Sequence, residues 1–269
     1  MDDKLLFEGE YIKGLKNGKA KEYFVYEKLI FEGEYLKSKR HGKGREYNRN
    51  EELIFEGEYL NGERSGKGKE YYETGELLFE GEYLKGERNG HGKEYNKKSE
   101  LIYEGEYLKG KRNKGKEYLK GELIFDGEYN EGKRWDGKGK EYSDNNKLLF
   151  EGEYIKGLKN GKAKEYYEYG KLKFEGEYIN SKRHGKGSEY NRYKNLIFEG
   201  EYLNGERSGI GKEYYETGEL LFEGEFLYGQ RNSHGKEYNK NGELIYEGQY
   251  FNNKKTGWAA AVFAHMAEN

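Results

Sequence analysis

The chain has 269 residues, 33% hydrophobic and 37% charged, and a formal net charge of −2. Lysine and arginine alternate with acidic residues throughout, so there is no basic stripe and we expect no nucleic-acid partner. No cysteine is present, which excludes disulfides and thiolate metal sites. The low hydrophobic content alone would favour disorder, but 29 tyrosines and 13 phenylalanines at regular intervals predict a folded chain.

An aromatic residue opens a repeated motif eleven times along the chain. Eight of the ten intervals between these residues are 24 residues long, and the other two are 22 and 25. A fixed period of this length predicts a stacked array without a single central core. The opening residues are Phe7, Phe31, Phe55, Phe79, Tyr103, Phe125, Phe150, Phe174, Phe198, Phe222 and Tyr246.

One repeat, from Phe55 to Leu78, reads FEGEYLNGERSGKGKEYYETGELL and predicts two strands. In FEGEY, aromatic and glycine positions alternate with glutamates, as expected of a strand with one aromatic and one acidic face. Asn61-Gly62 and Ser65-Gly66 supply the positive φ of tight turns. A second strand follows over 66–72, and Thr74-Gly75 turns the chain toward the next repeat. Each repeat is therefore predicted to be one β-hairpin, with glutamates facing lysines across it.

We therefore predict an all-β fold, an elongated single-layer antiparallel meander of about eleven stacked hairpins, twisted or trough-shaped. The array spans residues 1–257. FEGEYIKGLKNGKAKEY occurs at Phe7 and again at Phe150, which indicates a duplicated block, the first copy at about 5–147 and the second at about 148–257. Residues 258–269, WAAAVFAHMAEN, are expected to form a cap, a last strand or a tail.

Two irregular repeats interrupt the pattern. The stretch 112–115 has lost one residue and the stretch 134–137 has gained one, which we expect a turn to absorb. Trp135 lies in the longer stretch, and we expect it on such a turn.

Motifs that imitate chemical sites are explained by the repeat. Gly132 to Lys138 has the glycine spacing of a phosphate-binding loop, but Gly139 replaces the required Ser or Thr. The histidines recur in pairs 143 residues apart and do not converge on a metal. The FEGE glutamates lie on a solvated face. We expect no catalytic residues, cofactor or metal.

The pattern resembles the MORN repeat family, whose units read roughly YEGEWxNGxxxGxGxxxxxxG. FEGEY, NG and SGKG between Phe55 and Gly68, with Gly75, carry the resemblance, and all eleven repeats contain its first part. Tyr replaces the family's usual Trp, and the repeat is usually one residue longer. The resemblance implies a non-catalytic scaffold. Proteins with such repeats are often assembly, cytoskeletal or ciliary components, and the resemblance also makes a virion role conceivable.

The aromatic face of the sheet is the candidate binding surface. Its tyrosines are expected to pack within the sheet, and a single layer is expected to leave part of them for a partner. These residues are Tyr11, Tyr35, Tyr59, Tyr83, Tyr107, Tyr129, Tyr154, Tyr178, Tyr202, Phe226 and Tyr250.

The sequence leaves three functions open. The first is a scaffold that binds a protein partner or another copy of itself. The second is attachment to anionic lipid headgroups through basic turns, with Arg40, Arg112, Arg183 and Trp135 as candidate contacts. The third is a structural part of a virion or of a cytoskeletal assembly. No secretory signal or membrane span is visible, so we expect an intracellular, cytoplasmic protein, at a membrane periphery or in a large assembly.

Overall fold

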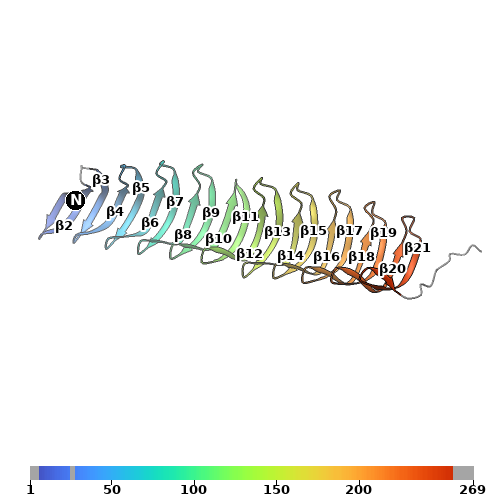
Figure 1. Ribbon diagram of the computed structural model, residues 1–269. Coiled ribbons are helices and arrows are strands. Elements are labelled where there is room, and N and C mark those ends of the chain that lie inside the picture. The colour runs from blue at the N-terminus through green and yellow to red at the C-terminus, as the bar shows by residue number, and fades with distance from the viewer. Residues whose placement is uncertain (1–5, 25–27, 257–269) are drawn as a thin grey trace, which may run out of the picture. The chain divides into compact units, whose positions relative to one another are not determined.

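The computed structural model describes residues 6–24 and 28–256. The chain divides into two compact units, Met1–Arg134 and Trp135–Asn269. Every regular element in the described ranges is a β-strand, and within each unit the hairpins follow one another in chain order (Figure 1). The predicted all-β antiparallel meander is confirmed. The residues expected to form a cap, 258–269, lie outside the described residues.

The described residues of unit 1 form eleven strands, paired antiparallel with their neighbours in sequence. They are β1 (Leu6–Ile12), β2 (Leu15–Tyr23), β3 (Leu29–Leu36), β4 (Lys39–Tyr47), β5 (Leu53–Leu60), β6 (Glu63–Tyr71), β7 (Leu77–Leu84), β8 (Glu87–Tyr95), β9 (Leu101–Leu108), β10 (Lys111–Leu119) and β11 (Glu122–Asn130).

Unit 2 repeats this arrangement, and its first strand begins two residues before the boundary. Its strands also pair antiparallel in chain order. They are β12 (Lys133–Tyr142), β13 (Leu148–Ile155), β14 (Leu158–Tyr166), β15 (Leu172–Ile179), β16 (Lys182–Tyr190), β17 (Leu196–Leu203), β18 (Glu206–Tyr214), β19 (Leu220–Leu227), β20 (Gln230–Tyr238), β21 (Leu244–Phe251) and β22 (Lys254–Thr256). The boundary between units falls before the predicted boundary of the duplicated blocks at 147–148, which stays a prediction.

The hairpin β5–β6 shows how a repeat folds. Asn61 and Gly62 have φ angles of 54° and 97°, the pair of positive values that a two-residue type I′ turn requires. The amide of Gly62 donates a hydrogen bond to the carbonyl of Arg40 in the preceding hairpin at 2.9 Å. Gly86 donates to Arg64 in the same way at 2.9 Å. Each of these turns is thereby held by the repeat before it.

A β-bulge lies where the sequence predicted a second turn. Gly57 pairs with Gly68, but Glu58 pairs with Ser65, so Gly66 and its neighbour are extra residues within β6. Gly66 has a φ of 66°, which glycine adopts without strain. The prediction of a turn at Ser65-Gly66 was therefore wrong. The positive φ was inferred correctly, but it serves a bulge, and β6 begins three residues earlier, at Glu63.

The core of each unit is a row of aromatic rings lying on glycines. The ring of Phe55 meets Tyr59 edge-on at 5.6 Å and Tyr83 of the next hairpin at 5.2 Å, and Phe55 is fully buried. A Cβ added to Gly57 would lie 2.7 Å from Phe55 Cζ and 2.7 Å from the Cα of Gly68. The glycine pair therefore lets a ring pack directly on backbone, which explains glycine in the interior of both strands.

Candidate functional site: a charged groove opposite the aromatic core

The aromatic face is filled by the chain itself. Ten of the eleven aromatic residues proposed as contacts, from Tyr35 to Tyr250 in that series, are buried, with exposed fractions of 3–7%. Tyr11 alone in the series is exposed, at 57%. The packing role of these rings is therefore observed, whereas their role as contact residues stays a prediction.

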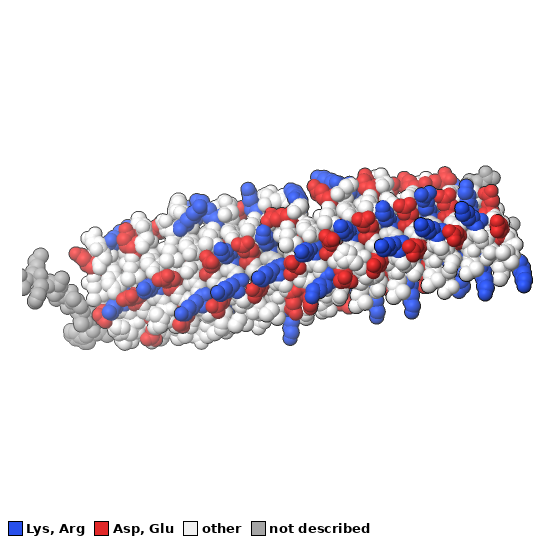
Figure 2. Space-filling model, turned by 180° about the vertical axis from the view of Figure 1, so that it is seen from behind, with Lys and Arg blue, Asp and Glu red and all other residues white. Residues whose placement is uncertain are grey.

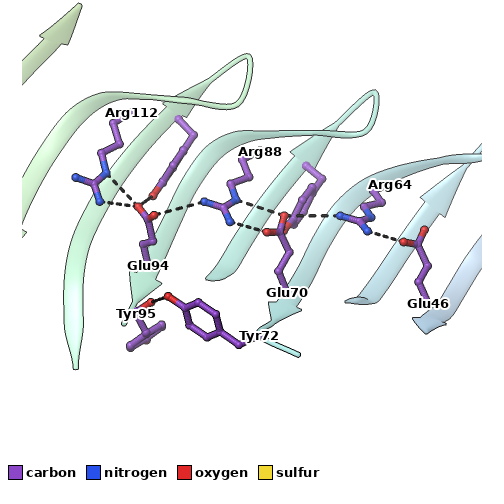
Figure 3. Close-up of polar contacts among 10 residues, drawn as sticks. Glu46, Arg64, Glu70, Tyr72, Arg88, Glu94, Tyr95 and Arg112 are labelled. Atoms are coloured by element: carbon purple, nitrogen blue, oxygen red, sulfur yellow. Dashed lines mark hydrogen bonds and ion pairs between the residues drawn. The ribbon is translucent and has the colours of Figure 1, made fainter. Parts of the chain in front are cut away.

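A ladder of arginines and glutamates covers the rings. Arg88 lies 4.2 Å above the ring of Phe79 and ion-pairs with Glu70 of the preceding hairpin at 2.5 Å. It also lies 3.8 Å from Glu94 of its own strand. Arg64 and Arg112 repeat this arrangement one hairpin before and one hairpin after (Figure 3). Because each of these carboxylates lies between two arginines, neighbouring hairpins are joined by charge-assisted hydrogen bonds.

The ladder shifts the pKa values of its members. Burial alone would raise the pKa of Glu70, but the hydrogen bonds and charge of Arg88, with the hydroxyl of Tyr83, hold it below its usual value. Burial and the charge of Glu70 raise the pKa of Tyr83. Burial alone would lower the pKa of Arg88, but the hydrogen bond to Glu70 outweighs burial and raises it. Around neutral pH, Glu70 and Arg88 are therefore charged and Tyr83 is neutral.

This ladder contains all three arginines proposed as lipid contacts. Arg40 ion-pairs with Glu22 at 3.0 Å and stacks 4.1 Å from the ring of Phe31. Arg112 and Arg183 occupy equivalent places over their own rings. Their side chains therefore contact rings and carboxylates of the fold itself. In the sequence, an arginine recurs nine residues after the opening aromatic, and this spacing could have predicted the contact.

Trp135 was expected on a turn, and that prediction was wrong. It lies half-buried within β12, and its carbonyl accepts a hydrogen bond from Gly157 at 2.8 Å. The extra residue is accommodated in the strand, which is ten residues long where most second strands have nine.

The ladder makes stability depend on pH. The pKa values of Glu46, Glu70 and Glu189 are lowered in the folded state, whereas an unfolded glutamate titrates at about pH 4.3. Their stabilising contribution is therefore present above that pH and lost as the pH falls through the folded-state values. We expect the urea midpoint to fall between pH 5 and 3. In Glu70→Gln the fall of the urea midpoint with pH should be smaller, whereas the exposed control Glu73→Gln should match the wild type. An equal fall of the midpoint in the wild type and both variants would contradict the prediction.

The opposite face of unit 1 contains a groove of about 1050 Å³. Its floor is the backbone of the glycine pairs, and two rows of charged side chains line its sides. Figure 2 shows Lys and Arg interspersed with Asp and Glu in rows on one side of the molecule. The floor is Gly9, Ala20, Gly33, Gly44, Gly57, Gly68, Gly81 and Gly92. Row 1 is Glu8, Lys21, Glu32, Arg45, Glu56, Lys69, Glu80 and Lys93, and row 2 is Lys19, Glu34, Lys43, Glu58, Lys67, Glu82 and His91.

The two rows differ in how they are bonded. In row 1, Arg45 lies 3.3 Å from Glu32 and 3.4 Å from Glu56, across both neighbouring strands. The hydroxyl of Tyr71 donates a hydrogen bond to Glu56 at 2.7 Å. In row 2, the carboxylate of Glu58 folds against Gly66, where a Cβ would overlap it. The predicted facing of glutamate and lysine is present in the hairpin β5–β6, where Glu56 pairs with Lys69, and the bulge shapes the second row.

The groove offers both charge signs at regular intervals. Neighbouring strands of a sheet are about 4.8 Å apart, so the sign alternates at about that spacing along each row. The described part of the chain brings together no three metal-ligating side chains, and it contains no helix long and apolar enough to cross a membrane. The arrangement is suited to binding a charged chain along its length.

These features define an array of β-hairpin repeats, and comparison with known proteins gives its family. The model of the MORN repeat matches residues 7–25, 31–50, 55–76, 79–98, 103–113, 174–191, 198–219, 222–243 and 246–257. That of a MORN repeat variant matches residues 135–156 and 159–180. The matches cover more than half of the chain, which therefore belongs to the MORN repeat family.

Other comparisons found less. The comparison with curated proteins found no match. Among solved structures, the crystal structure of TcdB2-TccC3-Cdc42 is 12% identical, over 85% of this chain and 14% of that one, with a TM-score of 0.20. The structure of TcdB2-TccC3-TEV is similar at 12% identity, over 85% and 13%, with a TM-score of 0.18. The chain thus spans about one seventh of the length of the first of these.

Proposed function

We propose that this MORN repeat protein is a non-catalytic scaffold that binds an extended segment of a partner protein along the charged groove of unit 1. The observation that supports this proposal is the groove itself, a continuous concave surface with two rows of regularly alternating charges. The aromatic face, by contrast, is covered by the arginine–glutamate ladder.

The spacing of the rows favours a particular backbone conformation in the partner. Like charges in one row recur every second strand, about 9.6 Å apart. A polyproline II helix has three residues per turn and rises about 9.3 Å per turn, so every third side chain returns to the same side at nearly this spacing. In a β-strand, side chains on one side recur at about 6.7 Å and lose register within two repeats. The groove therefore fits an extended segment with a charged residue at every third position.

The experiment uses two labelled peptides of equal length and equal charge. One is (Glu-Pro-Ala)5, and the other carries its five glutamates at every second position at one end. Fluorescence anisotropy at low salt should show at least fivefold tighter binding of the first peptide, because its carboxylates meet Lys19, Lys43 and Lys67 together. Equal affinity for both peptides would contradict the proposed register.

A matched pair of variants locates the site. Lys43→Glu with Lys67→Glu reverses two charges in the groove and should weaken (Glu-Pro-Ala)5 binding at least tenfold. Lys97→Glu with Lys98→Glu changes the net charge equally in an exposed loop outside the groove and should have little effect. If both pairs weaken binding equally, the peptide responds to overall charge and the groove is not its site.

A further inference from the structure

The duplicated sequence places the same surface on unit 2, with two differences. Adding 143 to a groove residue of unit 1 gives its counterpart in unit 2, and 21 of the 23 groove positions carry the same residue. The exceptions are Arg45, whose counterpart is Ser188, and Lys67, whose counterpart is Ile210. Both differences remove a positive charge.

The strand pairing confirms that these positions are equivalent. Arg45 pairs with Glu32 and Glu56, and Ser188 pairs with their counterparts Glu175 and Glu199. In the same way Lys67 pairs with Glu82, and Ile210 pairs with Glu225. The residues therefore lie at the same places on the same face, and they differ in side chain alone.

The charge balance of the two faces differs as a result. In unit 1 the groove residues include seven glutamates and seven lysines or arginines, which gives a formal charge of zero without His91. The same positions of unit 2 keep seven glutamates but have five lysines, which gives −2. Arg45 bridges two carboxylates in row 1, whereas Ser188 brings no charge to its neighbours. The hydrogen bond from the tyrosine hydroxyl is kept, from Tyr214 to Glu199 at 2.6 Å as from Tyr71 to Glu56 at 2.7 Å.

Ile210 adds an apolar contact to this acidic surface. Its side chain is 61% exposed in the middle of β18, where a lysine stands in unit 1. Glu201 and Glu225, on the two neighbouring strands, are also exposed. An exposed aliphatic side chain among carboxylates is suited to a ligand that combines positive charge with apolar groups.

We propose that the two units differ in selectivity, and that the charged face of unit 2 binds an extended protein segment rich in lysine or arginine. This inference rests on the proposed function, because it assumes that the charged face binds extended chains. Unit 1, with balanced rows, accepts a segment of either sign by shifting it one strand. Unit 2 accepts the basic segment and disfavours the acidic one.

The test exchanges the two differing residues between units in the full chain. Ser188→Arg with Ile210→Lys gives unit 2 the groove residues of unit 1, and Arg45→Ser with Lys67→Ile does the reverse. All four side chains are half-buried or exposed, outside the aromatic core. The probes are (Glu-Pro-Ala)5 and (Lys-Pro-Ala)5, titrated by calorimetry at low salt.

The wild-type chain should bind one (Glu-Pro-Ala)5 and two (Lys-Pro-Ala)5, and its unit 2 site for the basic peptide should be at least tenfold tighter than its unit 1 site. Ser188→Arg with Ile210→Lys should give a second site for the acidic peptide and weaken the unit 2 site for the basic peptide at least tenfold. Arg45→Ser with Lys67→Ile should weaken the acidic site at least tenfold. A wild-type chain that binds two acidic peptides, or exchanges that change nothing, would overturn the inference and leave the proposed function standing. If neither peptide binds, both the inference and the proposed function are overturned. If the wild-type chain forms a dimer that Ile210→Lys dissociates, the occupant of the unit 2 face is a second copy of the chain, and the inference is overturned.

Discussion

Replacing Phe79 with alanine is expected to lower the free energy of unfolding by about 3–5 kcal/mol, the usual loss for a fully buried phenylalanine. The Phe79 ring contacts Tyr83 at 5.7 Å and Tyr107 of the next hairpin at 5.0 Å, and it lies against Gly81 and Gly92. Its removal opens a cavity between two repeats and breaks the row of edge-on contacts.

The chain offers a matched control for this change. Tyr103 stands at the same position of the next repeat, fully buried, and its hydroxyl donates a hydrogen bond to the carbonyl of Glu106 at 3.1 Å. Phe79→Tyr should therefore cost under about 1.5 kcal/mol, as a near-isosteric core change does. Urea unfolding, with hydrogen exchange of β7 to β9 to localise the loss, measures both variants. Equal loss in the two would show that the cavity is not the cause.

Replacing Arg88 with alanine is expected to cost about 2–3 kcal/mol, because it leaves two carboxylates without a shared cation and uncovers a ring. The side chains of Arg88 and Glu70 are each 18% exposed, so their attraction is less screened than that of a surface pair. Stacking on Phe79 at 4.2 Å contributes to the loss.

Replacing Arg88 with lysine tests whether a positive charge alone is enough to preserve the stability of the fold. Lys159 occupies the equivalent position in unit 2, 2.8 Å from Glu141 and 3.9 Å from the ring centre of Phe150. Arg88→Lys should therefore cost under about 1 kcal/mol, since it loses the forked hydrogen bonds and keeps the charge. Urea unfolding at pH 7 compares the two variants. A loss in Arg88→Ala no greater than in Arg88→Lys would mean that the ladder covers the rings without stabilising them.

The hairpins could be predicted from the sequence because their signals are local. The alternation in FEGEY fixes which residues share a face, and Asn61-Gly62 fixes the turn. The burial of the aromatic face was predicted only in part, because it depends on pairs such as Arg88 and Glu70, which lie 18 residues apart and meet only when hairpins stack. The fixed spacing of arginine after the opening aromatic is a sequence signal of this burial. It can be interpreted only when the register of three neighbouring strands is known.

The groove was beyond prediction for a related reason. It depends on the bulge at Gly66, and Ser65-Gly66 favours a turn and a bulge equally well in sequence. Once the bulge is placed, Glu58 and Lys67 belong to one row and the floor of glycine pairs becomes continuous. The sequence therefore predicts the two faces of the sheet, and the stacking of hairpins decides which of them is open.

Two of the recurring contacts between consecutive hairpins share a direction. The amide of Gly62 donates back to the carbonyl of Arg40, and Arg64 donates back to Glu46, so in both contacts the later repeat supplies the donor and the earlier one the acceptor. During synthesis, domains fold from the amino-terminal side first. Each hairpin leaving the ribosome therefore meets the acceptors of these two contacts already in place on the hairpin before it, and the array can lengthen vectorially, without waiting for distant parts of the chain.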